Sequence, residues 1–281
     1  MTALNDLPAP AKLNLFLHIT GRRPDGYHLM QSAFMLIDWC DVLHVELTQS
    51  GHITREDLST PLPADDLILR AARLLQQASG TRLGAHIAID KRLPAMAGLG
   101  GGSSDAATAL IALNRLWGLG WGRRQLCALG LQLGADVPFF IFGRHAWAEG
   151  VGEQLSPLDL PRQRWVVVKP PSGLSTAAIF NAPDLERSHK SATIADFVAQ
   201  PHGFGQNDLQ QVAERLCPDV QAALKWLQTL GLKPRMTGSG SAVFASVNDT
   251  FVLPPAPAGW IVQMCHNLEQ HPLVGWCSSD E

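Results

Sequence analysis

One glycine-rich turn carries the strongest chemical signal in the sequence. Residues 98–105 read GLGGGSSD, with four glycines and two serines in eight positions. Glycine lets backbone N–H groups approach a ligand closely, and the positive end of a following helix dipole attracts anions. Ser103 and Ser104 add hydroxyl donors. The turn therefore predicts a cradle for a phosphate group, while an isolated turn of this kind is also typical of a plain flexible loop before a capped helix.

Two well-known phosphate-binding patterns do not fit this turn. A Walker A loop needs G-x-x-x-x-G-K-[ST], and the chain contains no Gly-Lys pair. A dinucleotide fingerprint needs G-x-G-x-x-G; Gly98 and Gly100 begin it, but Ser103 occupies the last glycine position. The sequence therefore excludes a P-loop and disfavours a Rossmann dehydrogenase.

The elements on either side of the turn are those that a phosphate cradle requires. Residues 86–90 (HIAID) predict a short strand. Residues 105–117 are rich in Ala and Leu and end before Gly118, which predicts a helix directly after the glycines. Residues 65–79 have apolar residues at helical spacing, acidic residues at the start and Gly80 just past the end, and predict an amphipathic helix.

Other segments supply further elements of a mixed fold. Residues 12–20 alternate with Leu and Ile on one face, which predicts a half-buried strand with Lys12 and Asn14 together on the other face. Residues 33–47 predict two strands separated by residues 38–41. Helices are also expected at 123–133 and within 207–228, and strands at 165–169, 260–264 and, after a Gly/Ser turn, within 236–247.

The length of the chain favours two domains. A chain of 281 residues is large enough to bury more than one core, with a single large domain as the alternative. Proline and polar residues follow Gly150, before the next predicted strand at residues 165–169. We therefore expect one domain over residues 1–150 and a second over residues 151–281.

Composition and charge exclude several classes of protein. The net charge of -3 gives no basic surface for nucleic acid. Apolar stretches such as residues 137–142 fall far short of the about 20 needed to cross a bilayer, and no signal peptide is visible. The five cysteines are scattered without a C-x-x-C pair, so neither a disulfide framework nor a protein metal site is expected. These features favour a cytoplasmic protein without nucleic-acid or membrane partners.

Several segments resemble, in the same order, the signature motifs of the GHMP kinases. The matching segments are residues 10–17 with 21–28, residues 94–107, residues 133–140 and residues 237–244. The resemblance covers nearly the whole chain and implies an α+β fold of two domains. The first would be ribosomal-protein-S5-domain-2-like and the second ferredoxin-like. The implied activity is ATP-dependent phosphorylation of a small-molecule alcohol.

The resemblance also implies where ATP binds. The implied ATP-binding residues are Ala95, Met96, Ala97, Gly98, Leu99, Gly100, Gly101, Gly102, Ser103, Ser104 and Asp105. Mg²⁺ is expected with ATP, held by the phosphates and Ser104. Residues 237–244 are implied to pack against this loop and order it. Lys91 and Arg92 fit a nucleotide contact and a solvated surface equally well.

Two residues are implied to be catalytic. Lys12 matches a lysine whose charge lowers the pKa of the substrate hydroxyl or of a neighbouring acid and stabilises developing negative charge. By itself, a single lysine is more often solvated. Asp136 matches an aspartate that accepts the proton of the attacking hydroxyl or orients that hydroxyl. On local grounds Asp136 is also a good helix N-cap before Pro138, and both roles can hold together.

The remaining implied residues bind the phosphate acceptor. Within the family, the triple glycine and the Tyr27-His28 pair are most similar to members that act on a cytidyl diphosphate alcohol. Tyr27 would stack on the cytosine ring, His28 would bond to its edge, and Asn14 would contact the alcohol part. Thr176 and Phe180 match positions beside this substrate. The alternatives are a GHMP kinase for another alcohol and a non-catalytic nucleotide- or partner-binding module.

Overall fold

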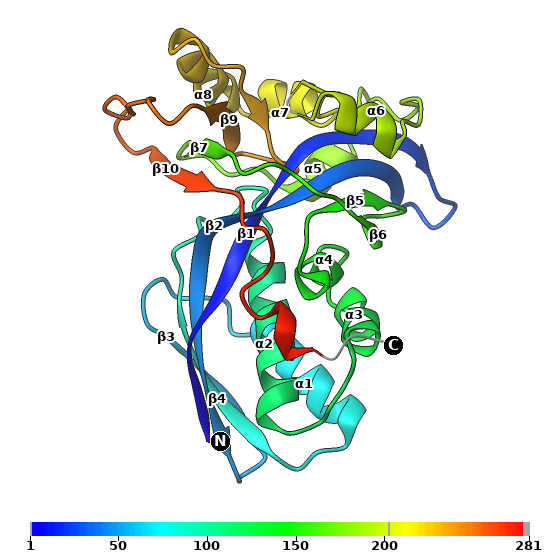
Figure 1. The fold of residues 1–281 in the computed structure, drawn as a ribbon, viewed down its shortest axis with the longest axis vertical. Coiled ribbons are helices and arrows are strands. Elements are labelled where there is room, and N and C mark those ends of the chain that lie inside the picture. The colour runs from blue at the N-terminus through cyan, green and yellow to red at the C-terminus, as the bar shows by residue number, and fades with distance from the viewer. Residues whose placement is uncertain (1, 202, 278–281) are drawn as a thin grey trace.

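The computed structural model describes residues 2–201 and 203–277, which form two β-sheets with helices packed around them (Figure 1). The larger sheet has the strand order β3-β4-β2-β5-β6, and its sixth strand, β1, also pairs with β2. Neighbouring strands are antiparallel except β3 and β4. The strands are β1 (Ala3–Arg22), β2 (His28–Thr48), β3 (Ile53–Asp57), β4 (Gly84–Asp90), β5 (Ala146–Glu149) and β6 (Gln154–Pro157).

A long hairpin of β1 and β2 runs from the larger sheet up to the second half of the molecule (Figure 1). The prediction of two strands within residues 33–47 was wrong, because β2 continues through the expected break. Pro10 pairs with Cys40 and Ala11 with Ile37, so β2 holds two extra residues at this point. A β-bulge takes up such extra residues without ending the strand.

β1 is buried on both faces, whereas the alternation of its residues predicted one solvated face. The side chains of Lys12, Asn14 and His18 are enclosed together with the apolar ones. The reason is tertiary: residues of β1 contribute to all three apolar clusters of the molecule. A polar side chain enclosed in this way needs protein partners, because burial without a hydrogen bond is costly.

Four helices pack beside the larger sheet (Figure 1). They are α1 (Leu67–Ser79), α2 (Gly101–Leu116), α3 (Arg123–Leu131) and α4 (Val137–Phe142). α1 agrees with the prediction: the Asp66 carboxylate accepts the Leu69 N–H at 3.1 Å, and Gly80 ends the helix in the left-handed conformation. Its apolar face includes Ile68 and Leu75, which are buried in the main core.

The second sheet lies in the C-terminal half and is antiparallel throughout. Its strands are β7 (Arg164–Lys169), β8 (Arg235–Met236), β9 (Val243–Val247) and β10 (Ile261–His266). The order β10-β7-β9-β8 is 4-1-3-2 when these strands are counted along the chain, as expected for a ferredoxin-like sheet. The connection from β9 to β10 contains no helix, whereas a ferredoxin-like fold has its second crossover helix at this point.

The helices of this half lie mainly between β7 and β8. They are α5 (Thr176–Phe180), α6 (Ile194–Ala199), α7 (Gln210–Leu216) and α8 (Pro218–Thr229), and the short 3-10 helix η1 (Val274–Trp276) follows β10. Residues of α7 and α8 pack with β7 and β9 in one apolar cluster. Among the helices of the described residues, none is long and apolar enough to cross a membrane.

The structure therefore has the α+β fold expected from the sequence, built in two parts. β6 follows Gly150 in the chain but pairs with β5 in the larger sheet. A division between residues 150 and 151 stays a prediction.

Candidate active site

A cleft of about 1140 Å³ gathers the predicted site residues. Every residue that the sequence assigned to catalysis or binding lines this cleft, except Ser104, which is fully buried beside it. The lining side chains come from β1, the start of β2, the loop before α2, the start of α4 and α5. Elements far apart in sequence thus meet in one concave site.

The glycine-rich turn forms the first turn of α2 as well as the loop before it. Gly98 and Gly100 both have φ of 73°, a left-handed conformation that strains other residues. The helix then begins at Gly101, and not at Asp105 as predicted, because glycine can also adopt helical angles. The first N–H groups of a helix lack internal acceptors. Gly101, Gly102 and Ser103 carry such N–H groups, and all three residues line the cleft.

The segment after β8 holds this loop in place. The Ser241 N–H donates to the Met96 carbonyl at 3.1 Å, and the Ala242 N–H donates to the Ala97 carbonyl at 3.1 Å. Both bonds join parts of the chain more than a hundred residues apart. The packing of residues 237–244 on the loop is therefore as the family resemblance implied.

Lys12 and Asn14 lie side by side on β1 and point into the cleft. The Lys12 ammonium donates to the Asn14 carbonyl oxygen and lies 3.7 Å from the Asp136 carboxylate. The Asn14 amide in turn donates to the Ser32 hydroxyl at 2.9 Å. The backbone of Lys12 is also tied to the phosphate loop, since its N–H donates to the Leu99 carbonyl at 2.9 Å. The ammonium is thus held in one place beside the glycines.

Asp136 occupies the N-cap position of α4 without capping it. Its backbone is helical, and its side chain makes no cap hydrogen bond, while Pro138 stands in the first turn as expected. The side chain is 34% exposed, against 5% for that of Lys12. The carboxylate is therefore available to the cleft, paired with one buried cation.

An aromatic corner closes another side of the cleft. Tyr27 is 64% exposed at the turn before β2, and the His28 ring packs 5.1 Å from the Phe180 ring. Thr176 and Ser239 exchange a hydrogen bond of 2.7 Å between their hydroxyls, which joins α5 to the segment after β8. Burial and the nearby positive charge of Arg187 and Arg22 lower the pKa of His28.

A buried charge cluster of Lys91, Asp41 and Asp105, which the sequence did not bring together, supports the start of α2. Lys91 lines the cleft, and its ammonium bonds to the Asp41 carboxylate and, at 2.8 Å, to the Asp105 carboxylate. Asp41 also accepts the backbone N–H of Leu93 at 2.7 Å. Burial, and the negative charge of Asp41, raise the pKa of Asp105 to about 8 despite Lys91. Two carboxylates here share one cation.

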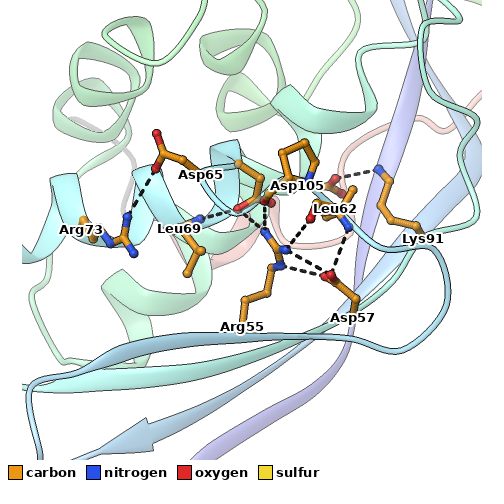
Figure 2. Close-up of polar contacts among 10 residues, drawn as sticks. Arg55, Asp57, Leu62, Asp65, Leu69, Arg73, Lys91 and Asp105 are labelled. Carbon is orange, nitrogen blue, oxygen red and sulfur yellow. Dashed lines mark hydrogen bonds and ion pairs between the residues drawn. The ribbon is translucent and has the colours of Figure 1, made fainter.

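Arg55 organises the wall that faces the glycine-rich turn. Its guanidinium bonds to the Asp57 carboxylate at 2.7 Å and to the Leu62 carbonyl at 3.1 Å (Figure 2). It also pairs with the Asp66 carboxylate at 2.7 Å. Leu62, Asp66 and Leu67 line the cleft. No sequence pattern indicates this wall, because Arg55 gathers partners from the end of β3, from the following loop and from the N-cap of α1.

The described residues do not form a resident metal site. Among them, no three His, Cys, Asp or Glu side chains gather closely enough to hold a metal ion. Ser104, the protein ligand expected for Mg²⁺, lies outside the cleft lining, and its buried hydroxyl has no hydrogen-bond partner within residues 2–201 and 203–277. The residues present therefore do not fit a Mg²⁺ held by the protein alone.

Two family patterns match this chain. The family described as GHMP kinases N terminal domain matches residues 66–144, which include the glycine-rich turn and Asp136. The family described as GHMP kinases C terminal matches residues 184–250.

Relatives with similar sequences span the whole chain. The chain is 61% identical over 285 residues to a protein of Paracidovorax citrulli (strain AAC00-1), with 100% of both chains covered. It is also 61% identical over 285 residues to a protein of Delftia acidovorans (strain DSM 14801 / SPH-1), covering 100% of this chain and 99% of that one. Both relatives are named 4-diphosphocytidyl-2-C-methyl-D-erythritol kinase.

Solved structures give the same result. A crystal structure of 4-(cytidine 5'-diphospho)-2C-methyl-D-erythritol kinase matches with a TM-score of 0.75 and 39% identity, covering 86% of this chain and 89% of that chain. A homoserine kinase from Cytophaga hutchinsonii matches with a TM-score of 0.63 over 96% of both chains, at 14% identity, which shows a shared fold alone.

Proposed function

The chain belongs to the GHMP kinase family, and on that premise we propose that it phosphorylates 4-diphosphocytidyl-2-C-methyl-D-erythritol. The reaction transfers the γ-phosphate of ATP to the 2-hydroxyl, in the non-mevalonate route to isoprenoid precursors. The observation that carries the proposal is a single cleft. It joins a glycine-rich helix start, a Lys–Asp pair and an aromatic corner.

The start of α2 is the proposed cradle for the phosphates of ATP. Backbone N–H groups at a helix N-terminus bind phosphate oxygens, and Gly101 and Gly102 leave them uncovered by side chains. Lys12 lies against this turn, as shown by the 3.1 Å between the Lys12 Cγ and a Cβ added to Gly100. The terminal phosphate would thus lie near the ammonium, which is where negative charge develops during transfer.

Asp136 is proposed to act on the attacking hydroxyl, as the base or by orienting it. Phosphoryl transfer depends mostly on positioning and electrostatics, so either role suffices. Lys12 at 3.7 Å from the carboxylate is proposed as the electrostatic activator. Asn14 is proposed to contact the alcohol part of the substrate, because it lines the cleft and is bonded to Lys12.

The aromatic corner is proposed to hold the cytidine part of the substrate. Tyr27 and Phe180 offer flat surfaces for stacking, and His28, whose ring packs against that of Phe180, offers a polar ring edge in the same cleft. Thr176 lies beside this corner on α5. We write Mg²⁺ as part of the substrate, entering with ATP, because the described residues do not fit a protein-held ion.

A kinase for another alcohol is the nearest alternative. The similar structures of homoserine and mevalonate kinases are only 13–17% identical, against 39% for the structure of the cytidyl-substrate kinase. A non-catalytic binding module is disfavoured for a different reason. Binding alone does not require a buried lysine paired with a carboxylate in the cleft.

The test is ATP consumption with a panel of acceptors. Diphosphocytidyl-methylerythritol, mevalonate, homoserine and galactose are each supplied with MgATP, and ADP release is followed. The proposal predicts turnover with the cytidyl compound only. Turnover with one of the other alcohols alone would contradict the substrate and leave the kinase assignment standing, whereas no turnover with any of the four would favour the binding module.

A further inference from the structure

Arg187 joins the two sides of the aromatic corner. It follows α5 in the chain, and its Nε donates to Nε2 of His28 at 3.1 Å. Its other two nitrogens donate to backbone carbonyls, among them those of Phe180 at 3.2 Å and Ala182 at 2.7 Å. One guanidinium therefore connects the imidazole at the start of β2 to the end of α5.

The bond to Arg187 determines which nitrogen of His28 carries the hydrogen. A guanidinium has only donors and keeps its proton in proteins. His28 must therefore accept through Nε2, and a neutral imidazole that accepts there carries its hydrogen on Nδ1. Within the described part of the chain, Nδ1 has no hydrogen-bond partner, and the His28 side chain lines the cleft.

The charges around His28 favour the same neutral form. Arg187 and Arg22 are the positive neighbours, and together with burial they lower the pKa of His28. Asp25, on the turn before β2, also lines this part of the cleft but is paired with Arg23 at 2.7 Å. Protonation would place an N–H on Nε2 facing the Arg187 donor, so the guanidinium opposes it.

We propose that Arg187 is a positioning residue that holds His28 as the Nδ1–H tautomer beside Phe180. The corner then presents one oriented N–H donor to a pyrimidine edge that carries an acceptor, such as the ring nitrogen or carbonyl of cytosine. The identity of that ligand as a cytidyl group rests on the proposed function. The tautomer and its dependence on Arg187 do not.

Arg187→Met removes the donor while keeping an unbranched side chain of similar length. Without this bond His28 is no longer held in one tautomer, and we expect KM for the cytidyl substrate to rise about tenfold. We expect kcat and the KM for ATP to stay within about twofold, because the lost bond does not involve the residues proposed to hold ATP or to act on the hydroxyl. A general weakening of the fold would instead change all three together.

Arg215→Met is the matched control. Arg215 forms an exposed ion pair of 2.7 Å with Asp184, and Asp184 lies three positions before Arg187 in the chain. Its loss perturbs the same segment and also removes one positive charge, but it leaves the bond to His28 in place. The control should therefore keep the KM of the wild-type protein for the cytidyl substrate.

Nitrogen-15 NMR of the His28 ring tests the tautomer directly, with His28→Gln to assign its signals. The wild-type protein should show hydrogen on Nδ1 and a lone pair on Nε2 at neutral pH. Arg187→Met should show a mixture of tautomers and a higher His28 pKa. Hydrogen on Nε2 in the wild-type protein, or unchanged spectra and KM in Arg187→Met, would overturn the proposal.

The two proposals fail in different ways. If the wild-type protein does not phosphorylate the cytidyl compound, the proposed function is wrong, and the NMR spectra still decide the role of Arg187. If the wild-type protein is active but the spectra contradict the tautomer, only the role of Arg187 is wrong.

Discussion

Replacing Gly98 with alanine tests how tightly the phosphate loop is held against the segment after β8. Gly98 has φ of 73°, and an added Cβ would lie 2.2 Å from the Thr237 carbonyl oxygen and 2.9 Å from the Gly240 nitrogen. Both neighbours are backbone atoms, so neither can swing aside as a flexible side chain would. The loop must move to admit the methyl group.

Two terms set the expected size of the effect. A left-handed conformation costs a residue other than glycine roughly 1–2 kcal/mol. Overpacking adds roughly 1–3 kcal/mol. Together they lower the free energy of unfolding by roughly 2–5 kcal/mol, a large part of the roughly 5–15 kcal/mol available to a typical folded protein. Because the displaced loop is the proposed cradle, affinity for ATP should fall as well, by at least about tenfold.

Gly118→Ala separates the two terms. Gly118 has φ of 66°, but no atom of the described residues outside its own turn lies within 4 Å of an added Cβ, so only the backbone term applies. Urea unfolding of both variants and calorimetric titration with ATP provide the comparison. The reasoning is refuted if Gly98→Ala is no less stable than Gly118→Ala and binds ATP as the wild-type protein does.

Two further substitutions probe the charge cluster and the aromatic corner. The folded pKa of Asp105 is raised from 3.8 to about 8. Since the native state then holds a proton that the unfolded state has lost, the contribution of this carboxyl to wild-type stability should fall as pH rises from about 4 to 8. Asp105→Asn removes this contribution, so the melting temperature of the variant should rise relative to that of the wild-type protein over this range; parallel curves for both proteins would contradict it. Tyr27→Ala should raise KM for the cytidyl substrate about tenfold through lost stacking, with unchanged melting temperature, and an unchanged KM would count against the stacking role.

Local features of the site could be predicted because their chemistry lies within a few residues. The glycine-rich turn, the caps of α1 and the shared face of Lys12 and Asn14 depend on spacing along one element. The start of α2 was misplaced for a local reason too. Glycine is compatible with both loop and helix, so Gly101 gave no signal of where the loop ends.

Features that depend on distant partners could not be predicted. Lys91 and Asp41 are 50 residues apart, and Arg187 and His28 are 159 apart, so no spacing rule links them. The burial of both faces of β1 has the same origin. Its alternation is typical of a sheet with one solvated face, and residues from distant parts of both halves of the chain cover the second face.

The central claim is that the Lys12–Asp136 pair acts on the hydroxyl of a cytidyl alcohol beside the phosphate cradle. Asp136→Asn tests it with little change of shape, and since this carboxylate does not cap α4, the variant should fold normally. With diphosphocytidyl-methylerythritol and MgATP, we predict a fall in kcat of about 10²- to 10⁴-fold, while the Kd for ATP stays within about threefold. Turnover by Asp136→Asn at the wild-type rate would contradict the account.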